Sequence, residues 1–598
     1  METSTAAPAR NATGSATIAD MMALAAERFA DQPAVKFKRD GAWHDVSYRE
    51  VGEIVSEIAR GLIDLGLRPG ERVALLCTTR PEWTYVDFGI TSAGGVVVPI
   101  YPTNSPSECA WVAGDSESRF IVCEDAGQVA KIREVRGELP ALEQIVVIDS
   151  VADAPDALSL DELRERGRRR DAAEVAERYR GVRPDDPYTI IYTSGTTGPP
   201  KGCVLTQGNY RSVLSMCEEV DVLIEDEVVY LYLPLAHSYA LLVQLVAFDL
   251  GCAIAYWGGD TKQIVPELME VHPTFLPSVP RIFEKIYTLV TANGDPEQIS
   301  RAVAVGLKVR ELEAAGKPIP DELRAAYEQA DQALFQNVRN AFGGRLRQAA
   351  TGAAPIAHDI LQFFYACGVP VLEGYGMTET STVTTSSTLK SHKFGTVGRP
   401  LPHSEVRIAD DGEILVRGPH IFAGYYKRDD TAFGAVEDGW LHTGDLGELD
   451  EDGYLRVTGR KKDIIITAGG KNLTPANLEN DLKHSRWISQ AVMYGDRRPY
   501  PVALITLDPE EIVAFARQEA LPEDVAALAR EPKVIELIQG VLDDVNSRYA
   551  RVEQIKRFFI LDHDLSQETG ELTPTLKVKR NVVNEKYADE FERLYSEA

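Results

Sequence analysis

The sequence predicts an α/β protein in which a large N-terminal domain of helix-covered sheets, with a small β-rich subdomain, precedes a small α+β C-terminal domain. Short β-rich apolar runs alternate with longer helix-like segments from about residue 17 to residue 375. This alternation favours parallel sheets covered by helices. After residue 400 tight hairpins replace it. At 598 residues the chain also exceeds what one hydrophobic core supports.

The chain is expected to begin with a disordered tail over residues 1–16. This stretch is rich in Ala, Thr and Ser and lacks the long apolar run of a secretory signal. The large domain is expected over 17–461. Its predicted strands include 72–76, 95–99, 120–123, 145–148, 189–192, 229–233 and 369–372.

The segment 239–257 is apolar enough to require a test for membrane insertion. Gln244 and Asp249 interrupt it, and a membrane-spanning helix would carry Asp249 near the bilayer centre at a cost of about 3 kcal/mol. We therefore predict a buried helix followed by a strand over 252–256, and no transmembrane segment.

Two further features divide the large domain. The stretch 303–342 is charged and rich in Ala, Leu, Glu and Lys, which predicts a solvated helical insertion, interrupted at Pro318–Pro320. In the segment 400–459, two pairs of strand-like runs flank acidic turns that end in Gly412 and Gly453. Glycine supplies the positive φ of a tight turn, so we predict antiparallel hairpins in a β-rich subdomain.

The C-terminal domain is predicted over 462–598, with its boundary at about 461–463 in the basic linker RKKD. Its predicted elements are a helix over 475–484, strands near 489–494 and 502–507, and helices near 509–518 and 533–547.

Charge and cysteine content limit the classes of function. A net charge of −28 opposes duplex nucleic acid as a partner, although a local loop of donors can still bind a nucleotide. The seven cysteines show neither paired nor metal-ligand spacing. This predicts reduced, buried thiols and a cytoplasmic protein.

The run YTSGTTGPPKG, residues 192–202, carries the strongest functional signal. Its hydroxyl groups and freed N–H groups can donate to phosphate oxygens, and its glycines let the backbone curl around a ligand. A Walker loop would open a helix at Gly-Lys-Ser/Thr, but Pro199 and Pro200 stand where that helix would begin. We predict a different kind of phosphate loop, with a polar surface turn as the alternative.

Three later runs add chemistry. EGYGMTET, residues 373–380, offers a flat ring, a hydroxyl and a carboxylate, or is only a strand-to-helix turn. WLHTGDLG, residues 440–447, places Asp445 where it could accept from two ribose hydroxyls, or is a turn aspartate. TAGGKN, residues 467–472, contains paired glycines that mark a turn or admit an extended ligand.

In this order the runs resemble the motifs of the adenylate-forming superfamily: acyl-CoA synthetases, firefly luciferase and the adenylation domains of peptide synthetases. The resemblance covers about residues 20 to 598 and rests on at least five ordered motifs. Within the superfamily, the insertion 303–342 and the ending LTPTLKVKR, residues 572–580, are most similar to a bacterial long-chain fatty-acid–CoA ligase. The resemblance implies the adenylate-forming fold, with a mobile C-terminal domain.

The resemblance also implies an ATP site. The loop up to Lys201 would cradle the β- and γ-phosphates, the segment 352–354 and Tyr375 would enclose adenine, and Asp445 with Arg460 would grip the ribose. Thr193 and Glu379 would hold Mg²⁺. The residues implied at the nucleotide are Thr193, Ser194, Gly195, Thr196, Thr197, Gly198, Lys201, Gly352, Ala353, Ala354, Gly374, Tyr375, Gly376, Thr378, Asp445 and Arg460.

The catalytic residues implied are Lys577, Glu379 and Thr378. Many relatives carry the catalytic lysine in a Gly-Lys pair, which is absent near this C-terminus. Long-chain members have Thr-Pro-Thr-aromatic-Lys instead, so we prefer Lys577 to Lys579. Lys462 matches the hinge about which the C-terminal domain swings.

Three residues are implied at the path of coenzyme A and the acyl group. Gly469 and Gly470 would line the pantetheine path. His237 resembles the residue at the acyl and thiol junction, or is a structural histidine.

The implied reaction is ATP-dependent activation of a long-chain fatty acid to acyl-AMP and pyrophosphate, followed by transfer of the acyl group to coenzyme A. The alternatives are transfer to a carrier protein, a luciferase-like oxidation, a non-catalytic binding protein and, least favoured, an ATPase or kinase. The expected substrates are ATP with Mg²⁺, a fatty acid and coenzyme A. The protein is expected in the cytoplasm as a monomer or homodimer, and peripheral membrane contact stays open.

Overall fold

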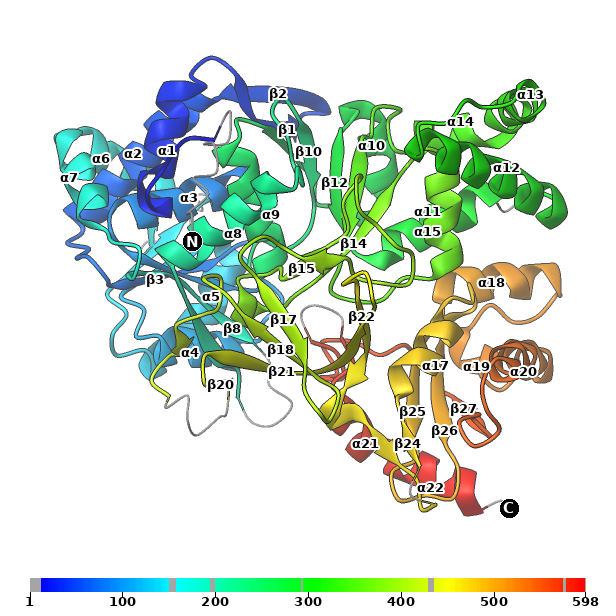
Figure 1. The fold of residues 1–598 in the computed structure, drawn as a ribbon. Helices are drawn as coiled ribbons and strands as arrows, with labels where there is room; N and C mark the ends of the chain where they lie inside the picture. Colours follow the sequence, from blue (N-terminus) through cyan, green and yellow to red (C-terminus); the bar gives the residue numbers. More distant parts are fainter. Residues whose placement is uncertain are drawn as a thin grey trace.

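Two mixed sheets form the large domain of the computed structural model, which describes residues 12–149, 157–193, 199–291, 294–428, 435–469, 471–573 and 577–596 (Figure 1). The nine-stranded sheet has the order β16 (Arg399–Pro400), β15 (Thr385–Ser386), β14 (Val371–Tyr375), β13 (Gln348–Thr351), β12 (Phe275–Ser278), β10 (Val228–Leu231), β11 (Ala253–Tyr256), β1 (Pro33–Arg39) and β2 (Ala42–Ser47). The eight-stranded sheet has the order β19 (Gly424–Tyr425), β9 (Lys201–Thr206), β8 (Pro187–Thr193), β4 (Val96–Ile100), β3 (Arg72–Leu76), β5 (Phe120–Cys123), β6 (Gln144–Val147) and β7 (Ala157–Ser159).

The two sheets enclose a shared layer of helices. Every residue of α3 (Pro81–Ser92) except Glu82, and every residue of α9 (Ser238–Asp249) except Tyr239, is buried. A helix that is apolar on all sides must have protein on all sides. One buried cluster accordingly joins these helices to alternate residues of both sheets. The cluster also includes residues of α1 (Ile18–Arg28), α2 (Tyr48–Asp64) and α8 (Gln207–Glu219).

Other helices cover the outer faces of the sheets. The intervening residues of β3, β4 and β5 pack on α4 (Pro106–Asp115) and α5 (Ala126–Glu134). The outer face of the nine-stranded sheet packs on α10 (Ile264–Val271), α11 (Pro280–Thr291), α14 (Gln336–Ala341) and α15 (His358–Ala366). Further out lie α6 (Leu160–Arg168), α7 (Ala173–Gly181), α12 (Pro296–Ala314) and α13 (Asp321–Ala330). Short 3₁₀ turns are η1 (Arg136–Glu138), η2 (Thr261–Gln263), η4 (Thr378–Thr380) and η5 (Lys461–Asp463), and η3 (Asp331–Phe335) is π-helical.

The described strands of the β-rich subdomain pack into the core of the large domain. Its strands are β17 (Glu405–Ile408), β18 (Glu413–Arg417), β20 (Val436–Glu437), β21 (Trp440–Leu449) and β22 (Leu455–Arg460). Both predicted hairpins are confirmed, because β17 pairs antiparallel with β18 and β21 with β22. Ile414, Val416 and Leu441 belong to the same buried cluster as α3 and α9. Packing therefore fixes this subdomain to the large domain.

The C-terminal domain packs around its own apolar clusters, whose members all lie between residues 465 and 595. Its strands are β23 (Ile465–Ile466), β24 (Asn472–Leu473), β25 (Ile488–Tyr494), β26 (Val502–Leu507) and β27 (Phe558–Ile560). Its helices are α17 (Pro475–Lys483), α18 (Pro509–Gln518), α19 (Val525–Leu528), α20 (Pro532–Ser547), α21 (Arg580–Lys586) and α22 (Ala588–Ser596). An ion pair joins the domains where Arg281 of α11 meets Asp508 at the start of α18.

Most predicted elements are confirmed. All seven predicted strands are present, and the largest shift of a boundary is three residues, at the end of β14. The segment 239–257 contains α9 and β11, and no described helix is long and apolar enough to cross a membrane. The insertion is helical, as predicted, but its first helix begins earlier, at Pro296. All seven cysteines are free and buried.

Two expectations need correction. The sheets are not purely parallel, since β8 pairs antiparallel with β9 and Thr193 faces Lys201. The predicted phosphate loop therefore connects two strands of one hairpin. Part of the expected disordered tail is folded: Thr13 and Ser15 are buried, and Thr13 Oγ1 donates to Asp249.

A buried carboxyl group in the shared helix layer predicts how stability depends on pH. Asp87 of α3 is fully buried and accepts from Tyr188 Oη at 2.9 Å and from Gln244 Nε2 at 3.0 Å. Burial raises the pKa of Asp87 to about 7, against the opposing effect of these hydrogen bonds. The protonated form is thus favoured in the folded state. Its contribution to stability is present below the unfolded pKa of about 3.9 and is lost as pH rises through the folded pKa.

We expect the free energy of unfolding of the native protein to fall from about pH 4 to about pH 7, by at most about 1.4 kcal/mol per pH unit from this group, and then to level off. Asp87→Asn removes the titrating group and should flatten this part of the curve, measured by urea denaturation at each pH. Asp185→Asn, at an exposed aspartate, is the control. Equal slopes for Asp87→Asn and the native protein would contradict the assignment.

Candidate functional site

The predicted site residues of the large domain lie where strands end. Thr193 is the last residue of β8 and Tyr375 the last of β14, while Gly352 follows β13 and His237 lies beyond β10. Neighbouring parallel strands place their carboxyl ends at one edge of a sheet, which is where open α/β sheets bind ligands. The register Thr351 to Glu373 sets the segments after β13 and β14 side by side.

A hydroxyl and a carboxylate come together beside the end of β8. Glu379 is buried, and its Oε1 accepts from Tyr425 Oη at 2.8 Å. Cys203 links the two predicted metal ligands: its Sγ lies 3.7 Å from Thr193 Oγ1, and Glu379 contributes to raising the pKa of its thiol, after burial. Lys201 Nζ lies 5.2 Å from the centre of the Tyr425 ring.

This pair of oxygen ligands fits a magnesium ion bound together with phosphates. Mg²⁺ prefers hard oxygen ligands and uses one or two carboxylates plus phosphate oxygens and water. Among the described residues, no three His, Cys, Asp or Glu side chains cluster into a metal site. Thr193 and Glu379 would therefore complete a coordination shell whose other ligands come from the substrate.

The segment 352–354, expected at adenine, is largely exposed. Ala353 and Ala354 are exposed, and Ala353 adopts a left-handed φ of 68°, which is uncommon for a residue with a Cβ.

The turn that carries Thr378 requires a glycine at position 376. A Cβ at Gly376 would lie 2.0 Å from the carbonyl oxygen of Thr382. Only glycine fits there, so the turn that carries Thr378 depends on it.

The ribose candidate Asp445 is held by two donors. Tyr375 Oη donates to Asp445 Oδ2 at 2.8 Å, and Arg460 Nε lies 2.8 Å from Oδ1. Asp445 and Arg460 face each other across β21 and β22, and only 6% of the aspartate side chain is exposed. The hydroxyl of Tyr375 therefore has a role in positioning Asp445, beyond the ring face expected for it.

The structure brings Lys577 of the C-terminal domain to this group. Burial lowers the pKa of Lys577, and the positive charge of Arg460 lowers it further. Asp445 and Glu379 act in the opposite direction. Lys577 as a whole residue is nevertheless exposed. Lys579, the alternative, instead occupies the N-cap position of α21.

The hinge candidate Lys462 directly follows an anchored residue. Lys461 Nζ lies 2.7 Å from Asp411 Oδ2 and 2.9 Å from Glu413 Oε2. The other oxygen of Glu413 accepts from the N–H of Gly444 at 2.8 Å. Lys462 is exposed, and partial burial together with the charge of Arg460 lowers its pKa. The ion pairs of Lys461 therefore end just before the predicted hinge.

His237 has a structural role that uses only one of its two ring nitrogens, Nδ1. Its Nδ1 accepts from the N–H of Tyr239 at 3.2 Å and caps α9. Burial lowers the pKa of His237 to about 4, and the charge of Lys577 contributes. The imidazole is therefore neutral at pH 7 and lies near the lysine. The Tyr239 hydroxyl donates to the carbonyl of Ala350 at 2.9 Å.

Some predicted residues do not join this group. Gly469 is exposed between β23 and β24 of the C-terminal domain. Lys577 and Lys462, rather than Gly469, are the residues of that domain whose pKa Asp445 influences. The remaining predicted residues, Ser194, Gly195, Thr196, Thr197, Gly198 and Gly470, lie outside the described part of the chain.

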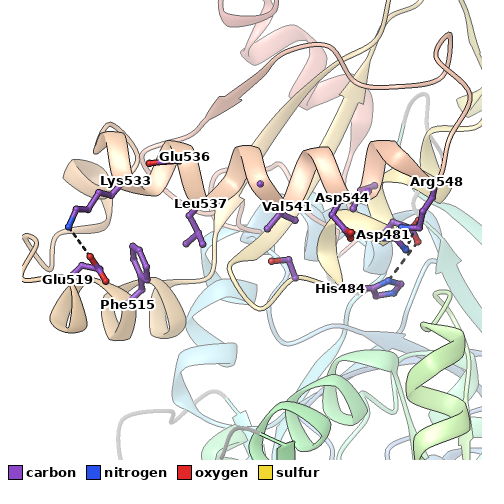
Figure 2. Close-up of a pocket in the computed structure, with 13 residues that line it drawn as sticks. Asp481, His484, Phe515, Glu519, Lys533, Glu536, Leu537, Val541, Asp544 and Arg548 are labelled. Carbon is purple, nitrogen blue, oxygen red and sulfur yellow. Dashed lines mark hydrogen bonds and ion pairs between the residues drawn. The ribbon is translucent and has the colours of Figure 1, made fainter. Parts of the chain in front are cut away.

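An open groove of about 860 Å³ lies elsewhere, among α17, α18 and α20 (Figure 2). Phe515, Leu537 and Val541 line it, together with charged side chains such as Glu519 and Lys533, which pair with each other at 2.8 Å. None of its lining residues belongs to the predicted site. The chemistry of the side chains therefore places the candidate site at the strand ends rather than in this groove.

Sequence reasoning missed four residues that hold the site together: Tyr425, Cys203, Thr443 and Glu413. The Thr443 hydroxyl accepts from the N–H of Asp445 at 3.1 Å. Each of the four acts through a contact with a residue distant along the chain or through a turn. Neither kind of contact leaves a periodic signal.

Comparisons with known proteins identify the family and the fold. Residues 22–426 match the protein family described as AMP-binding enzyme, and residues 462–598 match the AMP-binding enzyme C-terminal domain. The chain is 40% identical to the long-chain-fatty-acid–CoA ligase FadD15 of Mycobacterium bovis, over 93% of each chain. Its fold is similar to that of the anthranilate CoA ligase AuaEII in complex with anthranoyl-AMP, with a TM-score of 0.73 and 19% identity, over 99% of this chain and 100% of that chain. It is also similar to o-succinylbenzoate CoA synthetase from Bacillus subtilis in complex with ATP and magnesium, with a TM-score of 0.68 and 21% identity, over 94% and 98%.

The contacts of Asp445 predict how its loss affects nucleotide binding. In the native protein the Asp445 carboxylate faces Arg460 and would accept hydrogen bonds from the ribose hydroxyls. Asp445→Asn removes this negative charge. Because hydrogen bonds to charged groups contribute about 1.5–3 kcal/mol, we expect the affinity for AMP to fall about 10- to 100-fold, measured by calorimetric titration. Asp410→Asn, at an exposed aspartate of the same subdomain, should bind AMP as the native protein does. Unchanged affinity in Asp445→Asn would remove Asp445 from the ribose site.

Proposed function

Since this chain belongs to the AMP-binding enzyme family, we propose that it activates a long-chain fatty acid with ATP and transfers the acyl group to coenzyme A. The observation that carries this proposal is that Asp445 and Glu379 of the large domain lie near enough to Lys577, a residue of the C-terminal domain, to influence its pKa. A lysine near the predicted ribose and metal ligands would be able to act on a phosphate.

In the first step one oxygen of the fatty carboxylate attacks the α-phosphorus of ATP. A new O–P bond forms, the bond to the bridging oxygen breaks, and pyrophosphate leaves with that electron pair. The product is acyl-AMP, a mixed anhydride. Activation is needed because a free carboxylate is charged and delocalised and would have to expel oxide.

The residues of the site would act on this step by charge and position. Lys577 would stabilise the negative charge that develops on the α-phosphate oxygens, with Thr378 donating to the same phosphate. Asp445 and Arg460 would hold the ribose. Magnesium, bound by Thr193 and Glu379, supplies charge neutralisation at the phosphates.

In the second step the thiol sulfur of coenzyme A attacks the acyl carbon. A C–S bond forms, the C–O bond to the phosphate breaks, AMP leaves with that electron pair, and the thiol proton is released to solvent. Lys577 would occupy space near the acyl group, and rotation about Lys462 would withdraw it and bring Gly469 and Gly470 to the pantetheine path. His237, neutral at pH 7, would lie at the junction of the acyl group and the thiol.

Substrate and location are inferred from relatives and from the chain itself. The M. bovis relative, 40% identical over 93% of each chain, is named a long-chain-fatty-acid–CoA ligase, which supports a long-chain fatty acid and coenzyme A. We propose a cytoplasmic enzyme, monomeric or homodimeric, that meets its fatty acid in solution or at a membrane surface. A carrier protein is the alternative acyl acceptor.

A panel of carboxylic acids from acetate to stearate, each with ATP, Mg²⁺ and coenzyme A, tests the function. We expect AMP release with acids of long chain and acyl-CoA as the second product. An assay with a carrier protein in place of coenzyme A separates the two acceptors. The ligase assignment fails if no acid in the panel yields AMP.

Lys577→Ala tests the role of the lysine. We expect acyl-AMP formation to fall at least about 100-fold, because one preorganised electrostatic contact in a transition state contributes about 2.7–4 kcal/mol. Thioester formation from supplied acyl-AMP should stay within about twofold of the native rate, since the lysine is withdrawn in that step. Lys579→Ala is the matched control and should keep both steps. Equal loss of both half-reactions in folded Lys577→Ala would contradict the assigned role.

A further inference from the structure

A buried carboxylate lies at the base of the chain segment that carries Lys577. The side chain of Glu571 is fully buried. Lys586 Nζ donates to its Oε1 at 2.6 Å, and the hydroxyl of Tyr587 donates to the same oxygen. Thr569 Oγ1 donates to Oε2 at 2.5 Å, and the N–H of Ser566 does so at 3.1 Å. Four groups from the turn before Glu571 and from the end of α21 thus meet on one side chain.

The backbone of Glu571 is joined to the other side of the same segment. Its carbonyl oxygen accepts from the N–H of Lys579 at 2.7 Å, and Leu572 forms a β-bridge with Val578. Above this bridge the N–H of Thr573 donates to the carbonyl of Lys577 at 2.8 Å, and the N–H of Lys577 donates to Thr573 Oγ1 at 3.0 Å. The position of Lys577 therefore depends on two short segments joined by a single antiparallel β-bridge (the strand pair), with Glu571 at the end away from Lys577.

We propose that Glu571 is a positioning residue for Lys577. Its carboxylate ties α21 and the preceding turn to the strand pair, and so sets how far the lysine reaches toward Asp445 and Glu379. The inference deepens the proposed function, because it rests on the role of Lys577 in acyl-AMP formation. Glu571 touches no substrate; it acts through the lysine.

The chemistry of Glu571 suits a fixed anchor. Burial alone would raise its pKa, but the hydrogen bonds from Lys586, Thr569 and Tyr587 outweigh burial and lower the pKa to about 2. The group is therefore ionised at every pH at which the enzyme would work. Hydrogen bonds to an ionised acceptor are about twice as strong as neutral ones. Glutamine at 571 would replace one acceptor oxygen with a donor and leave buried donors without an acceptor.

A second anchor holds the other end of the segment independently. Arg580 Nη2 lies 2.7 Å from Glu479 Oε2, and Arg580 Nη1 donates to the carbonyl of Met493 at 3.0 Å. This ion pair fixes the start of α21 to α17 and β25. Loss of Glu571 should therefore loosen the strand pair while Arg580 keeps α21 attached, so the expected defect is misplacement of Lys577 rather than unfolding.

The experiment compares the two half-reactions of the full-length protein. In Glu571→Gln we expect the rate of acyl-AMP formation, measured as pyrophosphate release, to fall about 10- to 100-fold. This is the loss typical of a reacting group displaced by about 1 Å. Thioester formation from supplied acyl-AMP should stay within about twofold of native. Glu568→Gln changes the same charge at an exposed position three residues away and should leave both rates unchanged.

A double-mutant comparison tests whether Glu571 affects acyl-AMP formation through Lys577. Glu571→Gln should have no further effect on acyl-AMP formation once Lys577 is alanine. The inference is overturned if Glu571→Gln leaves acyl-AMP formation at the native rate, if it lowers both half-reactions equally, or if it lowers the rate as much without Lys577 as with it. If instead Lys577→Ala itself retains acyl-AMP formation, the proposed role of the lysine fails first.

Two milder variants apply if Glu571→Gln does not fold. Lys586→Met and Tyr587→Phe each remove one donor to the carboxylate and leave the others in place. Each should lower acyl-AMP formation by about three- to tenfold, equivalent to roughly 0.7–1.4 kcal/mol, with thioester formation retained. Native acyl-AMP formation in both variants would overturn the inference.

Discussion

The carboxylate of Asp445 is the contact on which the site depends, because it joins parts of the molecule that share no sequence neighbourhood. Its two partners come from the end of the nine-stranded sheet, through Tyr375, and from the last strand before the linker, through Arg460. A buried charge is costly unless it is paired and hydrogen-bonded. These two partners meet that requirement, and Lys577 of the C-terminal domain lies near enough for Asp445 to influence its pKa.

The balance of charge around Asp445 also gives a reason for domain rotation in the proposed reaction. Lys577, Lys462 and Arg460 influence one another as like charges, within a chain whose net charge is −28. A triphosphate bound among them would relieve this repulsion. Once pyrophosphate has left, the bound acyl-AMP carries less negative charge than the triphosphate, and the repulsion would favour withdrawal of the lysine. Electrostatics would thus couple the progress of the reaction to the position of the C-terminal domain.

The fold followed from sequence wherever the signal is local. Short β-rich apolar runs and glycine turns gave the strands and both hairpins, because local composition and positive φ are properties of a few neighbouring residues. The antiparallel pairing of β8 with β9 was not predicted, because the apolar run after Lys201 is short. The sequence of one strand also does not identify the strand with which it pairs. Tyr425 and Glu413 escaped for a related reason: each acts on a residue far along the chain, and only the folded structure brings the pair together.

The resemblance supplied the residues of the site, and the structure adds what holds them. The linker illustrates the difference. Its basic run was expected to contain the hinge, yet Lys461 is bound to Asp411 and Glu413 and moves with the large domain as long as those ion pairs persist. Glu413 also holds the N–H of Gly444, next to Asp445. One carboxylate therefore fixes both the ribose turn and the last residue before Lys462. Rotation that starts at Lys462 would leave the ribose turn undisturbed. The nucleotide could then stay in place while the C-terminal domain turns a different surface toward the site.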